Sequence, residues 1–235
     1  MKRLEKFTRR NLPHWYVPGA AHFVTYRVAG TIPIAVLEEL RHHAAAKLKK
    51  APPPGLSVLE HRLIVHKQSF ADYDRYLDKT CKVDWLARAD VASVIRDNLY
   101  HHHGGKYHLL AYCVMPNHVH VLFQPIDGTS KLLVPTYIGE TDDRNGPLAK
   151  IMHSLKSYTA NKINELLERP GQFWQHESYD HWVRDDEELE RIVEYIAANP
   201  VKAGLACNAE DWLFCSARDR FLRDGLQMAW LGDIL

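Results

Sequence analysis

The stretch Tyr112–Phe123, which reads YCVMPNHVHVLF, decides the fold of this chain. Two β-rich runs, near residues 108–114 and 118–124, flank the turn-forming tripeptide Met-Pro-Asn. A tight turn between two such runs predicts an antiparallel hairpin. Parallel strands need a long crossover connection, so the hairpin argues against a doubly wound parallel sheet.

The segments on either side of the hairpin predict one further strand and several helices. Residues 22–28 alternate and are rich in β-formers, so we expect a strand there. Helical patterns are found at residues 35–50, at 91–103, from 148 to about 167, and from 185 until Pro200 ends the helix. Residues 62–68 fit either a short strand or an irregular crossover, and residues 127–146 fit a long loop.

Short strands placed among helices, with a hairpin at the centre, predict an α+β fold. We expect a central antiparallel sheet with helices packed mainly on one face. At 235 residues the chain suits a single domain spanning residues 1–235. Its core would cover about residues 14–206, with residues 207–235 as a C-terminal extension.

Composition points to an ordinary globular protein of the cytoplasm. Apolar residues make up 46% of the chain and charged residues 25%. The sequence has no apolar run long enough for a membrane span, and its N-terminus does not resemble a secretion signal. The four cysteines are scattered without a Cys-x-x-Cys pair, which favours reduced thiols over a disulfide framework or a zinc ribbon.

His118 and His120 carry the first functional signal. Side chains two residues apart in a strand point to the same face, roughly 6.6 Å apart. Val119 and its alternate neighbours then face the core, and the two imidazoles can converge on one cation. The alternative is a pair of polar residues on a solvated strand face, which a motif this short allows.

Five segments together resemble the REP-associated tyrosine transposases, a branch of the HUH (His-hydrophobic-His) single-tyrosine transposases. They are YCVMPNHVHVLF, PHWYVPGAAHFVTYRVAGTIP (13–33), LAKIMHSLKSYTANKINELL (148–167), GQFWQHESYDHWVRDDEELERIVEYIAANPVKAGL (171–205) and DWLFCSARDRF (211–221). The resemblance covers roughly residues 14–218 in the family's order. Cys215 stands where the family usually has serine.

This resemblance implies an HUH endonuclease-like sandwich and a metal-dependent enzyme that cuts and joins single-stranded DNA. His118 and His120 would hold a divalent ion, Mg²⁺ or Mn²⁺, at the scissile phosphate. Tyr158 would be the catalytic nucleophile, forming a 5′-phosphotyrosine link and releasing a 3′-hydroxyl. The substrate would be hairpin-forming repeat DNA. The covalent link conserves the phosphodiester energy, and the sequence has no phosphate-binding loop for ATP.

The resemblance leaves the third metal ligand open. Related enzymes often have an amide side chain one turn after the tyrosine, but the residue four positions after Tyr158 is Lys162. A charged lysine cannot ligate a cation. Asn161, a water molecule or a residue from elsewhere could take this place. From its helical position alone, Tyr158 could also be a half-buried packing residue.

Six residues are candidates for DNA contact. Arg9 and Arg10 belong to a basic N-terminal arm, Lys156 and Lys162 share a helix with Tyr158, and Trp174 and Arg184 flank an aromatic segment. Solvated lysines and a packed aromatic cluster are the alternatives, the latter favoured for Phe173 and Trp182.

We therefore expect a cytoplasmic, nucleoid-associated transposase-like enzyme, a monomer or homodimer with no membrane partner. One rival is a module of the same fold that binds nucleic-acid hairpins without cleaving them. The other is a metallohydrolase with a zinc site, which a third ligand such as Asp or Cys, bound zinc and a lack of DNA affinity would favour.

Overall fold

The computed structural model describes residues 6–9, 13–79, 83–126 and 146–222. The expected loop at 127–146 lies outside the described residues except for its last position. Arg10 and the end of the expected C-terminal extension also lie outside them.

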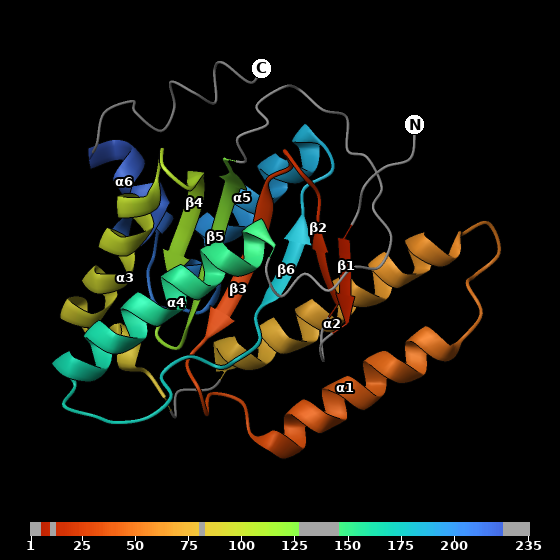
Figure 1. The fold of residues 1–235 in the computed structure, drawn as a ribbon, viewed down its shortest axis with the longest axis horizontal. Helices are drawn as coiled ribbons and strands as arrows, with labels where there is room; N and C mark the ends of the chain where they lie inside the picture. The colour runs from red at the N-terminus through yellow and green to blue at the C-terminus, as the bar shows by residue number, and fades with distance from the viewer. Residues whose placement is uncertain (1–5, 10–12, 80–82, 127–145, 223–235) are drawn as a thin grey trace.

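A four-stranded antiparallel sheet forms the centre of the molecule (Figure 1). Its strands, in spatial order, are β4 (Tyr107–Val114), β5 (His118–Pro125), β3 (His22–Arg27) and β6 (Tyr179–Trp182). The predicted hairpin is β4–β5, and its turn is closed where the backbone N–H of Met115 donates to the carbonyl of His118 at 2.9 Å. The predicted α+β class with a central antiparallel sheet is thus confirmed.

Two helices cover the front face of the sheet in Figure 1, α3 (Ala89–His102) and α4 (Pro147–Leu166). Their apolar stripes, which include Ile95 and Leu155, pack against Val119 and its alternate neighbours on β5. The burial of these side chains follows from the helical and strand periods of the sequence.

The opposite face is covered as well, by α5 (Asp186–Lys202) and α2 (Val58–Lys79). Ile196 of α5 and Phe70 of α2 pack with Leu122 on this side of β5. Helices therefore lie on both faces, where the sequence predicted one main face. Part of the difference arises from α2, because the ambiguous residues 62–68 lie inside this 22-residue helix.

The N-terminus of α2 carries a capping box that explains its start. Ser57 Oγ accepts a hydrogen bond from the N–H of Glu60 at 3.2 Å, and Glu60 Oε2 accepts one from the N–H of Ser57 at 2.8 Å. Helix α1 (Ile34–Lys49) precedes it, and Leu37 of α1 packs against Leu77 of α2 to form a helical hairpin.

The remaining elements lie at the margins of the sheet. They are β1 (Lys6–Arg9), β2 (Pro13–Tyr16), α6 (Ser216–Leu222) and the 3₁₀ turns η1 (Trp85–Ala87) and η3 (Ala209–Asp211). Strands β1 and β2 pair with each other. Asp219 of α6 accepts hydrogen bonds from the hydroxyls of Tyr100 and Tyr112, which fastens α6 to α3 and β4.

None of the helices in the described ranges is long and apolar enough to cross a lipid bilayer. Within the same ranges Cys113, Cys207 and Cys215 form no disulfide. Cys81 lies outside the described residues.

The burial of His22 predicts that the free energy of unfolding falls as the pH is lowered. The ring is fully buried and stacks on Tyr16, and burial lowers the pKa of His22 to about 4. Below the ordinary pKa of about 6.5 the unfolded chain binds a proton that the folded chain does not, so stability falls with pH between 6.5 and 4. We expect the free energy of unfolding of the wild type to fall relative to that of His22→Gln, at up to about 1.4 kcal/mol per pH unit.

Urea titrations of both proteins at pH 7.5, 6.0 and 5.0 measure this difference. Other histidines titrate in both proteins and cancel in the comparison. Parallel curves for the two proteins over this range would contradict the prediction.

Candidate active site

His118 and His120 face each other on the α2–α5 side of the sheet. Both side chains are buried, and their Nε2 atoms lie 2.9 Å apart. The Nδ1 atom of His118 is 2.5 Å from Asn117 Oδ1, and the Nδ1 atom of His120 is 2.7 Å from Thr25 Oγ1. If each Nδ1–H donates to its oxygen, both Nε2 lone pairs point to the same place, which is how histidine ligands are usually held.

Asp74 of α2 is the third member of this cluster. Its Oδ1 atom lies 3.4 Å from Nε2 of His120, is buried, and makes no hydrogen bond. The ligand atoms of Asp74, His118 and His120 all lie within 4.8 Å of one another. Sequence reading missed Asp74 because residues 62–68 were not assigned to a helix. The Ser57–Glu60 capping box was the available signal for that helix.

Burial sets the protonation state of this cluster. It lowers the pKa of His118 well below its ordinary value, an effect that His120 strengthens, and lowers the pKa of His120 to about 3, with a smaller contribution from Lys202. Burial raises the pKa of Asp74, while His118 and a hydrogen bond from Tyr195 lower it. Two neutral imidazoles and one carboxylate oxygen without a hydrogen bond suit a divalent transition metal.

Tyr195 of α5 completes the cluster. Its hydroxyl donates a hydrogen bond to Asp74 Oδ2, and its ring centroid lies 5.5 Å from that of His120. The ammonium of Lys202, two turns further along α5, lies 4.8 Å from the centre of the ring. Burial raises the pKa of Tyr195 and the charge of Asp74 raises it further, whereas a hydrogen bond from Asn199 lowers it.

Tyr158 does not lie near His118 and His120. It lies on α4, which packs on the opposite face of the sheet, and its side chain is 50% exposed. Lys162 on the same helix pairs with Glu165 at 3.0 Å. The expected grouping of Tyr158 with His118 and His120 is therefore not what the structure shows.

Three of the proposed DNA contacts have other partners. Trp174 is only 4% exposed, and its Nε1–H donates to Thr159 Oγ1 at 2.9 Å, so it is a core residue. The Nζ atom of Lys156 donates to the carbonyls of Gln175 and His176 at 2.6 and 2.9 Å. Arg184 forms a paired contact with Glu188 at 2.9 and 2.8 Å.

Phe173 and Trp182 are buried, as the packed-cluster alternative predicts. Nothing is described for the Arg9 side chain in β1.

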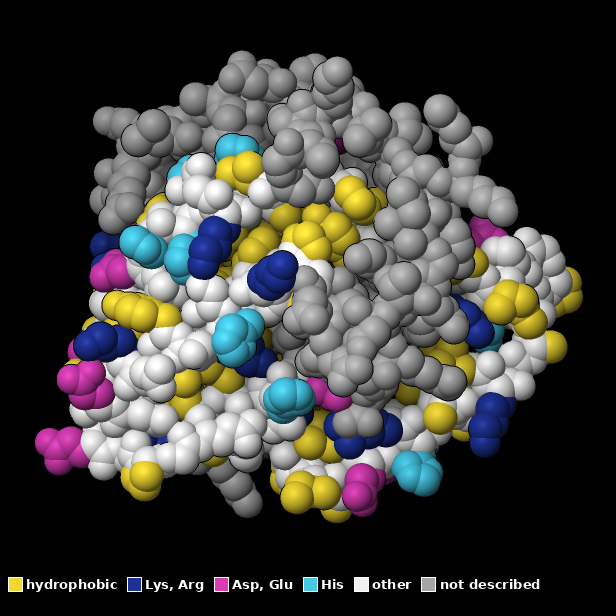
Figure 2. All heavy atoms as spheres, in the orientation of Figure 1, with side chains coloured by type: hydrophobic (Ala, Val, Ile, Leu, Met, Phe, Trp, Pro, Cys, Tyr) yellow, Lys and Arg dark blue, Asp and Glu magenta, His cyan; other side chains and the backbone are white. Residues whose placement is uncertain are grey.

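A large cavity lies between α4 and residues 171–178 and has a volume of about 1070 Å³. Lys150, His153 and Lys156 line it. On this side of the molecule, most acidic side chains lie toward the margins, and lysine, arginine and histidine side chains lie nearer the middle (Figure 2). This surface is suited to a polyanion, but it is on the other face of the sheet from Asp74 and the two histidines.

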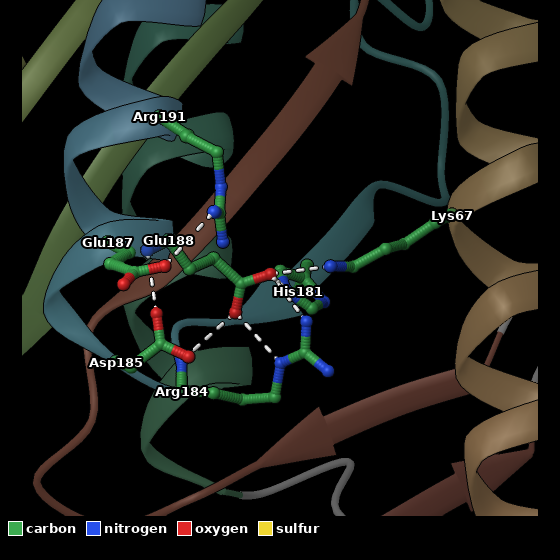
Figure 3. A network of polar contacts seen from close by, with 7 residues as sticks. All are labelled: Lys67, His181, Arg184, Asp185, Glu187, Glu188 and Arg191. Atoms are coloured by element: carbon green, nitrogen blue, oxygen red, sulfur yellow. Dashed lines mark hydrogen bonds and ion pairs between the residues drawn. The ribbon is translucent and has the colours of Figure 1, made fainter.

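An ionic network around the buried carboxylate of Glu188 holds α2 and α5 together (Figure 3). Glu188 at the start of α5 contacts Lys67 of α2 at 2.5 Å, His181 of β6 at 3.1 Å and Arg184 at 2.8 Å. Burial alone would raise the pKa of Glu188, but its hydrogen bonds to these three residues lower it on balance.

The Lys67–Glu188 contact is the first of two contacts that set the register of α5 on α2. Asp74 follows Lys67 by seven residues, and Tyr195 follows Glu188 by seven. Seven residues are about two helical turns, so the ion pair and the Asp74–Tyr195 hydrogen bond lie on the same sides of the two helices.

Glu188→Gln should lower the free energy of unfolding by about 2 kcal/mol, because it removes the buried charge that accepts hydrogen bonds from Lys67 and Arg184. Glu187→Gln is the matched control: Glu187 is one residue away, its side chain is 87% exposed, and it contacts Arg191 at 3.6 Å. An exposed pair of this kind contributes less than about 1 kcal/mol. Urea denaturation of both variants tests the difference, and equal effects would contradict it.

Comparison with known proteins gives a significant similarity in sequence. The chain is 29% identical over 108 residues to a Haemophilus influenzae protein provisionally named a REP-associated tyrosine transposase. The match covers 46% of this chain and 57% of that protein, so the chain spans little more than half the length of this relative. This similarity confirms the resemblance seen in the sequence. No protein-family model matches the chain.

A solved structure of a REP-associated tyrosine transposase bound to a REP hairpin also aligns with the chain. The alignment covers 92% of this chain and 85% of that one, at 16% identity and a TM-score of 0.43.

Proposed function

We propose that this chain is a metal-dependent tyrosine transposase of the REP-associated type, which nicks and rejoins single-stranded DNA. The observation that carries the proposal is the convergence of Asp74, His118, His120 and the Tyr195 hydroxyl in one polar cluster. A phenol next to a candidate metal site is the arrangement that phosphoryl transfer to tyrosine requires. The sequence similarity supports the same family.

Within this proposal Tyr195, rather than Tyr158, is the nucleophile. Its hydroxyl lies in the cluster, and Tyr158 lies across the sheet. The family pattern adds a second reason. The amide expected one turn after the tyrosine is not at the fourth position after Tyr158, where Lys162 stands, but the fourth residue after Tyr195 is Asn199, which is buried. Asn199 is thus a further candidate ligand, in addition to Asp74.

Tyr195 and Asp74 carry out the bond-making and proton-transfer steps. Tyr195 attacks phosphorus, and its hydroxyl proton passes to the carboxylate of Asp74, the group that already accepts its hydrogen bond. A Tyr–O–P bond forms, the bond from phosphorus to the 3′-oxygen breaks, and that oxygen takes the proton from Asp74 and leaves as a 3′-hydroxyl. Attack by another 3′-hydroxyl reverses these events and joins the strands.

Asp74, His118 and His120 would hold the divalent ion, which polarises the scissile phosphate and offsets the charge that develops on it. Imidazole nitrogen favours Mn²⁺ over Mg²⁺, which prefers oxygen ligands. We therefore expect activity with both ions, at lower concentration with Mn²⁺.

The substrate we propose is a single-stranded segment beside a DNA hairpin. Tyr195 is partly buried between α2 and the sheet, so a phosphodiester must leave a stacked duplex to reach its hydroxyl. The basic surface over α4 could bind the hairpin stem through its phosphates. Such an enzyme would act on the chromosome in the cytoplasm.

Asp74 also favours a second candidate, a metallohydrolase, because an acidic third ligand was one of the features expected of a zinc site. The two candidates differ in the fate of the phosphate. A hydrolase transfers it to water and leaves no protein–DNA bond, whereas the transposase leaves a phosphotyrosine.

The test is incubation of the protein with end-labelled single-stranded repeat DNA and Mn²⁺, followed by denaturing electrophoresis. We expect a labelled band at the mass of protein plus DNA that is absent in EDTA. Cleavage without an adduct would support the hydrolase, and binding without cleavage would support the non-cleaving module.

A further inference from the structure

A small polar cavity opens beside the candidate active site, under the α1–α2 hairpin. Its volume is about 40 Å³, and its walls include Thr25, Arg27, Arg41, Asp74 and Glu177. Two of these residues also belong to the candidate site, since Thr25 contacts His120 and Asp74 is one of the possible ligands. The cavity is therefore continuous with that site.

Arg27 is placed in this cavity by the register of the sheet. It is the antiparallel partner of His118 across β3 and β5, so both side chains point to the same face. Nη1 of Arg27 makes one long hydrogen bond, to Thr31 Oγ1 at 3.4 Å. Burial lowers the pKa of Arg27 to about 10, so the guanidinium is still charged at neutral pH.

Arg41 of α1 is the second cation of the cavity. Nη2 lies 3.7 Å from Glu177 Oε2, and the buried Nε atom makes no hydrogen bond. Two guanidiniums and two carboxylates thus line the cavity, and Asp74 directs its carboxylate toward Tyr195 and His120. The Nε atom of Arg41 is a buried donor without an acceptor, and the hydrogen bond of Arg27 Nη1 is long. A bound oxyanion would accept hydrogen bonds from both guanidiniums.

We propose that Arg27 and Arg41 bind a backbone phosphate of single-stranded nucleic acid, one that neighbours the phosphate reaching Tyr195. A phosphodiester offers two acceptor oxygens that share one negative charge, and guanidiniums bind phosphate oxygens in pairs. A cavity of this volume holds about three waters, which suits phosphate oxygens and excludes a base. This subsite rests on the proposed function for its neighbour, but it can be tested without any chemistry.

The test measures binding in EDTA, so that cleavage plays no part. Fluorescence anisotropy gives the affinity of wild type, Arg27→Gln and Arg41→Gln for a short single-stranded oligonucleotide over a range of salt concentrations. Arg75→Gln is the matched control, since Arg75 lies on α2 with a side chain 64% exposed and pairs with Asp72 at 3.3 Å. Circular dichroism confirms that each variant is folded.

We expect each cavity variant to bind about tenfold more weakly or worse, with a salt slope smaller by about 0.7. Arg75→Gln should bind like the wild type. A scan with one neutral methylphosphonate at a time should find a single position that weakens the wild type but not Arg27→Gln. Unchanged affinities and slopes, or no such position, would overturn the subsite even if the covalent adduct forms.

Inorganic phosphate alone is the second arm, because free phosphate offers the same oxygens. Under the proposal, millimolar phosphate leaves the melting temperature of wild type and Arg27→Gln equally unchanged. A rise in the wild type that Arg27→Gln lacks would assign the cavity to free phosphate and overturn the nucleic-acid assignment.

Discussion

Tyr195→Phe should abolish the covalent protein–DNA adduct, whereas Tyr158→Phe should leave it intact. Phenylalanine retains the ring contact with His120 but lacks the hydroxyl that would attack phosphorus. Loss of a nucleophile removes chemistry altogether, so we expect a decrease of about 10³-fold or more in adduct formation. Denaturing electrophoresis with labelled single-stranded DNA and Mn²⁺ measures both variants side by side.

The two tyrosines are a matched pair, because each lies on a helix that packs against the sheet, on opposite faces. Tyr195→Phe also removes the hydrogen bond to Asp74, at a cost of about 1 kcal/mol, so urea denaturation should confirm a folded protein. Hairpin binding should stay within about twofold of the wild type, since no phosphate-binding cation is lost. An adduct lost with Tyr158→Phe and kept with Tyr195→Phe would return the role to Tyr158.

The sequence predicts the parts of the site that depend on local periodicity. Alternation along β5 places His118 and His120 on one face, and the structure confirms that they converge. The turn at Met-Pro-Asn predicts the hairpin that holds them. These inferences hold because strand alternation and turn chemistry act over a few residues.

The residues that complete the site depend on tertiary packing, which the sequence reading did not resolve. Asp74 reaches the histidines because α2 crosses the second face of the sheet, and periodicity alone does not say which face a helix covers. Tyr195 lies in a helix that was predicted, yet its role was overlooked. The amide of Asn199 one turn later was the available signal, and it is the feature that Tyr158 lacks.

Trp174 was expected to contact DNA, but in the structure it packs in the core. An aromatic residue among polar neighbours fits base stacking and core packing equally well in sequence. The structure decides between them: the indole contacts Tyr26 edge to face at 4.8 Å, and its N–H is satisfied by Thr159. A base cannot stack on this ring unless the core opens.

The double variant His118→Ala, His120→Ala should eliminate cleavage in both Mg²⁺ and Mn²⁺. It removes both nitrogen ligands and leaves Asp74 as the single protein ligand of the cluster found in the described part of the chain. His43→Ala is the control, because His43 is exposed on α1 and belongs neither to the cluster nor to the basic surface over α4, and its activity should match the wild type. Cleavage rates under each ion, with circular dichroism to verify folding, measure the effect.

Asp74→Asn tests whether the Asp74 carboxylate both binds the metal ion and accepts the proton of Tyr195. Asparagine retains an oxygen ligand but removes the negative charge and the acceptor for the Tyr195 proton, so we expect cleavage to fall by about 10²-fold or more. Mn²⁺ affinity in the absence of DNA, measured by electron paramagnetic resonance, should fall as well, because a neutral amide holds a divalent ion less strongly than a carboxylate.

A double-alanine protein that still cuts in Mg²⁺ would show that the two imidazoles serve something other than the metal. An Asp74→Asn protein with wild-type Mn²⁺ affinity would assign the third ligand to another residue, for which Asn199 is the nearest candidate on α5.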